Sequence, residues 1–237
     1  MSVFKTDKEI VDHVKNAIEG AQKFNTKLTR TSLLASGILN FFGMSGRRTR
    51  VLLNELGAKE DIKYVEVGTH TGSTLFSVMY ENNTIKALCC DNWTEFGGPR
   101  DEFLTNAKLF MSVADQRQTL MLVDGDFRNL SFGEGELTDI DFYNYDGPHM
   151  KEDQYEGIVK AYPGLADRFV LFVDDWNWGG PREGTLEALE KLEVEVLYKK
   201  EITTPDEIVQ DGIMINRFQN SEWHNGIAVF ACKKKNN

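Results

Sequence analysis

Several features that would point to other classes of protein are scarce or absent. The 237-residue chain has three cysteines and no Cys-x-x-Cys or Cys/His zinc spacing, so neither a disulfide framework nor a zinc site is expected. Cys89 and Cys90 are adjacent in an expected strand and would point to opposite faces. No apolar run approaches the ~18 residues of a membrane span. The charged segment 1–12 lacks the apolar stretch of a signal peptide. We therefore expect a cytoplasmic protein with no membrane partner.

Positive charge is also in short supply. The chain has 27 Lys and Arg against 37 Asp and Glu, a net charge of −10. Because nucleic-acid phosphates are bound by Lys and Arg, this balance argues against nucleic acid as a partner. The three lysines at 233–235 are better explained as a solvated tail.

Apolar spacing predicts N-terminal helices followed by alternating strands and helices. Helix-like spacing covers 6–24 and 29–43, and a further helix is expected over 46–57, closed by Gly57. The expected strands are then 62–67, 85–90, 119–123, 140–145 and 168–173, and the expected helices are 72–80, 100–113, 151–162 and 181–192. Such alternation predicts an α/β fold, a doubly wound and mostly parallel sheet with helices on both faces.

The two ends of the chain differ from this pattern. The strand candidates 194–199, 211–218 and 226–232 leave little room for helices, so antiparallel pairing is expected there. Residues 1–44 are expected to form a helical cap on a main domain of residues 45–237. The cap would be either a homodimer face or a lid that shapes a substrate pocket, and the sequence favours neither.

A glycine-rich turn, Glu66-x-Gly68-x-x-x-Gly72, follows the first expected strand of the main domain. Glycine lets the backbone approach a ligand, and the helix that starts near Ser73 would direct its N-terminus at that ligand. Neither the Gly-x-Gly-x-x-Gly fingerprint of dinucleotide-binding proteins nor the Lys-Ser/Thr of a P-loop is present. The turn therefore predicts a nucleotide-type ligand bound in another way.

Acidic residues end all five of the expected parallel strands. They are Glu66, Asp91, Asp124 with Asp126, Asp146, and Asp174 with Asp175. Ligands of such sheets bind outside the carboxyl ends of the strands, and gathered carboxylates repel one another, so a shared site is favoured. Asp91 lies about 20 residues beyond the turn, the separation at which an acid accepts ribose hydroxyls. An Asp that merely starts a turn is the alternative.

This combination resembles class I S-adenosylmethionine-dependent methyltransferases over roughly residues 60–190. The resemblance implies a Rossmann-like sheet of seven strands whose last strand is antiparallel. It also implies that the turn and the strand ends bind S-adenosylmethionine, with Asp126 accepting from the adenine amine. The implied cofactor-binding residues are Glu66, Gly68, Thr69, Gly72, Ser73, Asp91, Asn92, Asp126, Phe127 and Asp146.

Two strand ends, Asp146-Gly147-Pro148-His149 and Asp174-Asp175-Trp176, resemble those of metal-dependent O-methyltransferases of the macrocin and novobiocin-sugar type. This resemblance implies a divalent metal, Mg²⁺, held by Asp146, Asp174 and Asp175, a set of hard oxygen ligands. Some members have a second acid two residues after the first, where this chain has Pro148. His149 is therefore the expected catalytic base, because imidazole titrates near neutral pH. A helix-start residue or a contact to the methionine end of the cofactor is the alternative.

The sequence thus predicts methyl transfer to an oxygen of a small hydroxylated acceptor, such as a sugar, natural product or metabolite. A nicotinamide-dependent oxidoreductase and a non-catalytic cofactor-binding protein that docks a partner are the alternatives. Four large side chains follow the strand ends and would either line an acceptor pocket or simply pack in loops: Trp93, Trp176, Trp178 and Arg182. His70 is expected to act through its backbone, and His13 and His224 are expected outside the site.

Overall fold

The computed structural model describes residues 2–204, 208–210, 213–215 and 222–235. The α-helices are α1 (Asp7–Lys23), α2 (Leu33–Leu39), α3 (Arg47–Leu56), α4 (Ser73–Met79), α5 (Arg100–Val113), α6 (Lys151–Ala161) and α7 (Gly179–Lys191). The strands are β1 (Lys63–Val67), β2 (Lys86–Asp91), β3 (Thr119–Asp124), β4 (Ile140–Tyr145), β5 (Leu165–Val173), β6 (Glu195–Ile202), β7 (Ile208–Gln210), β8 (Ile213–Ile215) and β9 (Ile227–Lys233). Among these helices, none has the length and apolar character needed to cross a bilayer.

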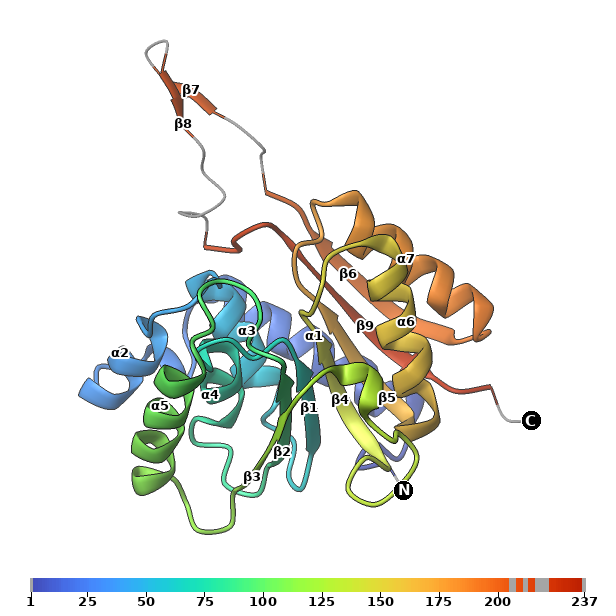
Figure 1. Ribbon diagram of the computed structural model, residues 1–237, viewed down its shortest axis with the longest axis horizontal. Coiled ribbons are helices and arrows are strands. Elements are labelled where there is room, and N and C mark those ends of the chain that lie inside the picture. Colours follow the sequence, from blue (N-terminus) through green and yellow to red (C-terminus); the bar gives the residue numbers. More distant parts are fainter. Residues whose placement is uncertain (1, 205–207, 211–212, 216–221, 236–237) are drawn as a thin grey trace.

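Seven strands form one sheet in the order β3-β2-β1-β4-β5-β9-β6 (Figure 1). The pairs β1/β2, β2/β3, β1/β4 and β4/β5 are parallel, and β9 lies antiparallel between β5 and β6. The predicted α/β sheet with an antiparallel last strand is confirmed. Strand order reverses between β1 and β4, which is where ligands bind in sheets of this kind.

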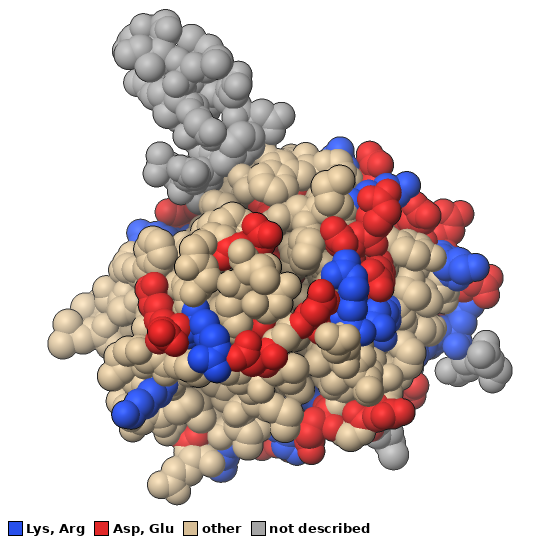
Figure 2. Space-filling view, viewed as in Figure 1, with Lys and Arg blue, Asp and Glu red and all other residues tan. Residues whose placement is uncertain are grey.

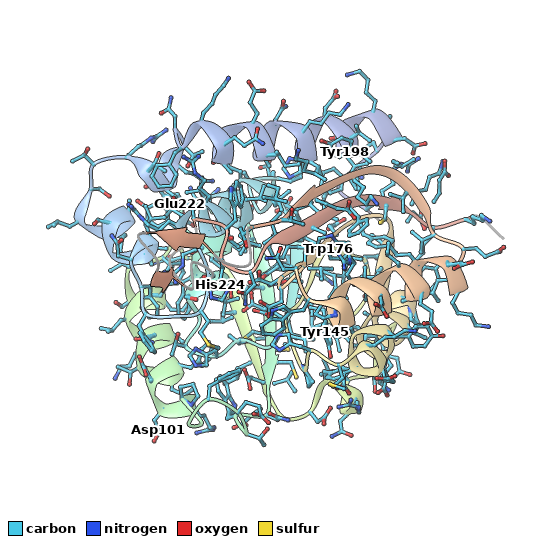
Figure 3. All side chains as sticks on the ribbon, turned by 90° about the horizontal axis from the view of Figure 1, so that it is seen from above. Asp101, Tyr145, Trp176, Tyr198, Glu222 and His224 are labelled. Carbon is cyan, nitrogen blue, oxygen red and sulfur yellow. The ribbon has the colours of Figure 1, made fainter. Side chains whose placement is uncertain are left out.

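Side chains that alternate along the strands supply two apolar faces. Tyr64 and Phe142 belong to the core shared with α1 to α5, whereas Val65 and Tyr143 belong to the core shared with α6 and α7. Figure 3 shows these layers, with α1 on one side of the sheet and α6 and α7 on the other. The adjacent residues Cys89 and Cys90 on β2 belong to the first and the second core respectively, as predicted.

The first helix illustrates why these segments fold as they do. Its buried residues Ile10, Val14 and Ala21 recur at helical spacing and form one apolar stripe. The Thr6 side chain accepts a hydrogen bond from the backbone N–H of Glu9 and caps the start of the helix. The buried stripe joins the same apolar core as α3 and α4. The domain boundary at residue 44 stays a prediction.

The second expected helix, residues 29–43, is much shorter than predicted. Helical structure is limited to a 3₁₀ turn at Lys27–Thr29 and to α2, and the chain from Asn40 to Gly46 is not helical. The carbonyl groups that end α2 accept hydrogen bonds from the Arg50 side chain, which satisfies them without a further helical turn. In the expected strand 211–218, residues 213–215 form β8, which pairs with β7 alone, and the rest lies outside the described residues.

Close packing of α6 on β4 depends on Gly157. A Cβ atom at this position would overlap the ring of Tyr145. We expect Gly157→Ala to lower the free energy of unfolding by about 1–3 kcal/mol, because overpacking outweighs the better helix propensity of alanine. Urea denaturation measures the change.

The matched control is Gly37→Ala in α2, where the added Cβ would lie more than 4 Å from every described residue outside its own helical turn. This variant should be equal to the wild type or up to about 1 kcal/mol more stable. Equal stabilities for the two variants would contradict the packing described here.

Candidate functional site

The glycine-rich turn and the end of β4 touch through their backbones. Gly68 has φ +85°, a conformation that favours glycine, and a Cβ there would overlap the carbonyl oxygen of Asp146. The Asp146 amide donates to the carbonyl oxygen of Val67 at 2.9 Å, and the Gly68 amide donates to that of Cys90, also at 2.9 Å. Three strand ends are therefore fixed relative to one another at the point where the sheet order reverses.

Asp91 holds the same turn from the end of β2. Its carboxylate accepts the backbone N–H of His70 at 2.8 Å and that of Trp93 at 2.7 Å. His70 thus acts here through its backbone, in the left-handed region at φ 50°. The carboxylate is part-exposed beside the turn, where a ligand hydroxyl would find remaining lone pairs.

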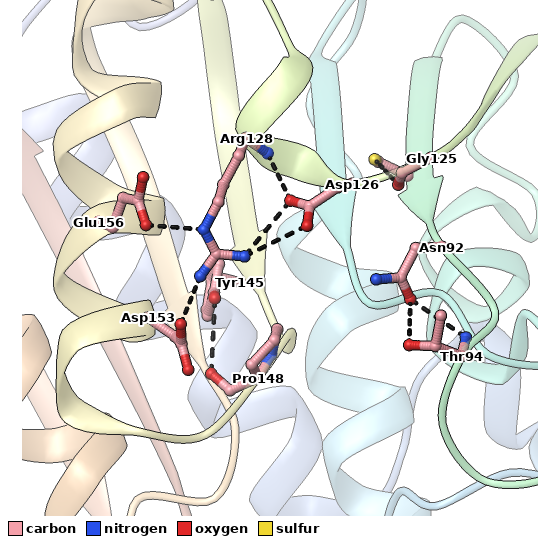
Figure 4. A network of polar contacts seen from close by, with 10 residues as sticks. Asn92, Thr94, Gly125, Asp126, Arg128, Tyr145, Pro148, Asp153 and Glu156 are labelled. Atoms are coloured by element: carbon pink, nitrogen blue, oxygen red, sulfur yellow. Dashed lines mark hydrogen bonds and ion pairs between the residues drawn. The ribbon is translucent and has the colours of Figure 1, made fainter.

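Asp126 follows β3 and is oriented by Arg128. It accepts the Arg128 backbone N–H at 2.8 Å, and the guanidinium also pairs with Asp153 and Glu156 on α6 (Figure 4). Phe127 is buried edge-on against Tyr145, with ring centroids 5.3 Å apart.

There is open space beside Gly125, the residue that follows β3. Apart from its neighbours in sequence, no described residue would lie within 4 Å of a Cβ on Gly125. Asn92, after β2, uses its side-chain oxygen to accept from the amide and hydroxyl of Thr94 (Figure 4). Asn92 and Asp124, at the ends of β2 and β3, are exposed.

The ends of β4 and β5 bring two carboxylates to one imidazole. His149 Nε2 lies 2.9 Å from Asp175 Oδ2 and 3.5 Å from Asp146 Oδ1. One possible metal-ligand atom from each of the three residues lies within 4.8 Å of the other two. The Asp174 carboxylate is not in that group and accepts the backbone N–H of Asp175 at 3.0 Å. Two of the three predicted metal ligands therefore converge with the predicted base.

The protonation of this group is set by its ion pairs. Burial lowers the pKa of His149, but the hydrogen bonds and charges of Asp146 and Asp175 outweigh burial and raise it to about 10. Burial would raise the pKa of Asp175, yet His149 holds it below its usual range. Burial raises the pKa of Asp146 and, with the neighbouring carboxylates, raises that of Asp174 well above its usual value. His149 is thus an imidazolium at neutral pH.

Glu66 is beneath the turn, inside the core. Its Oε2 accepts from the Tyr64 hydroxyl and from the Asn144 amide, whereas its buried Oε1 has no hydrogen-bond partner among the described residues. Burial raises the pKa of Glu66 to about 8, so the side chain is mostly protonated at neutral pH. Glu66 therefore differs from the other strand-end acids, which reach the rim of the sheet.

Sequence reasoning missed two residues beside Asp175. The Asn225 amide donates to Asp175 Oδ1 at 2.6 Å, and His224, expected outside the site, is close enough for the charge of Asp175 to affect its pKa. Trp176 and Asn177 bond to the backbone of Gly226 and Asn225 (Figure 3 labels Trp176 and His224). Because β9 runs antiparallel, the residues before it lie at the carboxyl ends of the parallel strands. The predicted antiparallel direction of the last strand could therefore have pointed to residues 224 and 225 as part of the site.

Two cavities lie away from this rim. One of about 480 Å³ is lined by residues of α7, β6 and β9, including Leu186, Val196 and Phe230. The other, of about 350 Å³, is lined by residues that include Asn25 and Glu55. No strand-end acid lines either cavity, so the convergence of side chains, rather than cavity size, identifies the candidate site.

No protein-family model matches the chain, and no curated protein matches its sequence. Solved structures do match its fold. An S-adenosylmethionine-dependent O-methyltransferase from Thermotoga maritima is 16% identical, with a TM-score of 0.55 over 87% of this chain and 72% of that one. TYW2 of M. jannaschii, solved in complex with AdoMet, is 12% identical, with a TM-score of 0.51 over 83% and 78%. Precorrin 8w decarboxylase from Methanobacterium thermoautotrophicum is 16% identical, with a TM-score of 0.50 over 82% and 93%. These similarities confirm a Rossmann-like methyltransferase fold.

Glu66 makes stability depend on pH in a defined direction. Its pKa is about 8 in the folded chain against an ordinary 4.5, so between these values the native state keeps a proton that the unfolded state has lost. The free energy of unfolding should therefore fall as pH rises. Relative to the wild type, Glu66→Gln should gain roughly 2–4 kcal/mol between about pH 5 and pH 8. Urea denaturation of both proteins across this range measures the difference, and parallel curves would contradict it.

Proposed function

We propose that this chain is an S-adenosylmethionine-dependent methyltransferase that methylates an oxygen of a small hydroxylated acceptor with the help of a divalent metal. One observation carries the proposal. In a sheet with the methyltransferase strand order, the glycine-rich turn contacts Asp146 through Gly68 and is bonded to Asp91 through His70. The elements proposed to hold the methyl donor are thereby joined to the carboxylates proposed to hold the acceptor.

The chemistry of the methyl donor suits the side chains at the strand ends. S-adenosylmethionine carries a positive sulfonium and ammonium and presents ribose hydroxyls and an adenine amine as donors. The rim offers carboxylate acceptors for these groups, with Asp91 proposed for the ribose, Asp126 for the adenine and Asp146 near the methionine end. Open space beside Gly125 would admit a planar base. Thr69, Gly72 and Ser73 complete the proposed set through the turn.

The second carboxylate group suits a divalent cation. Asp146, Asp174 and Asp175 lie at two neighbouring strand ends, and burial, together with the charges of Asp146 and Asp175, raises the pKa of Asp174. His149 is the cation that contacts Asp146 and Asp175 in the described structure. Carboxylates alone favour Mg²⁺, whereas a set that includes the imidazole would favour a transition metal. When bound, such a metal would lower the pKa of an acceptor hydroxyl.

The proposed reaction is a single in-line displacement. The acceptor oxygen forms a bond to the methyl carbon as the bond from that carbon to sulfur breaks, which leaves a neutral thioether. The hydroxyl proton passes to a base, for which His149 is the candidate. As an imidazolium His149 cannot accept a proton, so this role requires that its contacts with Asp146 and Asp175 change first. Asn225 would keep Asp175 in place during that change.

The choice of a small acceptor is supported by charge. The net charge is −10, and the face drawn in Figure 2 shows basic and acidic side chains interspersed over its described part. Next to His149, the exposed Trp178 lies edge-on with its ring centroid 5.2 Å from that of the imidazole. An aromatic side chain at this position could pack against an acceptor ring.

A homodimer through the N-terminal helices also stays a prediction.

Binding of the donor is tested by calorimetry with S-adenosylhomocysteine. We expect the wild type to bind, and Asp91→Asn to bind at least about 10-fold more weakly, because the neutral amide is a poorer acceptor for two hydroxyls. Asp115→Asn is the control, since the Asp115 carboxylate pairs with exposed Arg117 in the loop before β3. Well-folded wild-type protein that binds no S-adenosylhomocysteine, or prefers a reduced nicotinamide, would overturn the proposal.

The metal is tested separately. Asp146→Asn and Asp175→Asn should each weaken binding of Mg²⁺ or Mn²⁺ in calorimetry and lower methyl transfer on the order of 100-fold or more. The thermal midpoint of each variant controls for folding. If a chelator and both substitutions leave methyl transfer unchanged, the metal is excluded while the methyltransferase proposal stands. Stronger binding of Mn²⁺ than Mg²⁺ would favour His149 as a ligand over Asp174.

A further inference from the structure

Arg50 on α3 is a buried cation bound by neutral oxygens. Its side chain is 3% exposed, and its hydrogen bonds to other described residues go to backbone carbonyls and one hydroxyl. Burying an unpaired charge is costly, and burial lowers the pKa of Arg50 to about 10, which still leaves it charged at neutral pH. A leucine or methionine would fill such a position at lower cost, so the charge calls for an explanation.

The guanidinium holds the segment that links α2 to α3. Nε donates to Ser45 Oγ at 2.8 Å, Nη1 to the Phe41 carbonyl at 2.6 Å and Nη2 to the Gly43 carbonyl at 3.2 Å. Longer bonds reach the last carbonyls of α2, at 3.3 and 3.4 Å. These carbonyls carry the partial negative charge of a helix C-terminus, which offsets part of the desolvation of the guanidinium.

The segment held by Arg50 lies directly against the glycine-rich turn. The Thr71 hydroxyl donates to the Phe42 carbonyl at 2.6 Å, and Ser45 Oγ lies 3.4 Å from Ser73 Oγ. A Cβ on Gly43 would overlap the Ser73 side chain. The guanidinium of Arg50 therefore holds residues 41–45, and these residues in turn contact Thr71 and Ser73 in and just after the glycine-rich turn.

We infer that Arg50 is a positioning residue for the methyl donor. It fixes residues 41–45 against Thr71 and Ser73, so that this half of the turn has its binding conformation before the donor arrives. Such preorganisation strengthens binding because less conformational freedom is lost on association. The inference rests on the proposed function and extends it to a residue outside the turn. A simple packing role for Arg50 would affect stability alone.

Arg48, two residues earlier on α3, is a matched control. Its guanidinium also donates to carbonyl groups at a helix C-terminus, those of Ala21 and Gln22, and it lies 3.8 Å from Glu222. These contacts do not involve the glycine-rich turn. Lysine at either position keeps the charge and loses the planar fork of donors. Both substitutions should lower the thermal midpoint by a few degrees.

The two variants should differ in donor binding. For Arg50→Lys we expect S-adenosylhomocysteine to bind about 10-fold more weakly and the KM for S-adenosylmethionine to rise similarly, with kcat within about threefold. For Arg48→Lys all three quantities should stay within about twofold of the wild type. Equal effects of the two variants on affinity, or no effect of Arg50→Lys, would overturn the inference.

A second variant keeps the test decisive if Arg50→Lys does not fold. Thr71→Val removes the hydroxyl that bonds to Phe42 and leaves Arg50 in place. It should weaken S-adenosylhomocysteine binding in the same direction, and unchanged affinity would count against the inference. Wild-type protein that binds no S-adenosylhomocysteine would instead overturn the proposed function, so the two failures are distinguishable.

Discussion

The arrangement of the site depends on one close backbone contact, between Gly68 after β1 and Asp146 after β4. Side chains larger than hydrogen at position 68 would force these strand ends apart. The contact lies where the strand order reverses, so it joins the part of the sheet proposed to hold a methyl donor to the part proposed to activate an acceptor. The sheet places Asp91, Asp146 and Asp175 relative to one another, because Asp91 ends β2, Asp146 follows β4 directly and Asp175 comes two residues after β5.

Around this contact the molecule balances negative charge in two ways. At the ends of β4 and β5, His149 is the cation between Asp146 and Asp175. Beneath the turn, burial raises the pKa of Glu66 enough to keep its proton, although the hydrogen bonds from Tyr64 and Asn144 act in the opposite direction. In the first group Asp146 and His149 are part-exposed, whereas Glu66 is fully buried in the core. Carboxylates on one sheet are therefore stabilised in two different ways, by an ion pair and by protonation.

Much of this could be predicted from sequence, because strand ends are marked locally. The glycines of the turn and the acids at Asp91, Asp146 and Asp175 each follow a short apolar run, and parallel pairing brings such ends together. The contributions of Arg50 and Asn225 could not be read in this way. Arg50 occurs in a polar stretch of an amphipathic helix, and Asn225 precedes a strand rather than following one. Their positions result from tertiary packing between distant segments.

The contacts just before β9 also suggest where insertions or deletions would be tolerated in this chain. The Thr204 hydroxyl donates to the carbonyl of His224 and accepts from the Asn177 amide, so these contacts form a closure between positions 204 and 224. The backbone carbonyl of Glu222 accepts hydrogen bonds from the amides of Arg48 and Thr49, which anchors the residues beside this closure to α3. Insertions or deletions beyond this closure would alter loop entropy only slowly with length. Relatives of this protein could therefore differ widely there while Asn225 keeps its contact with Asp175.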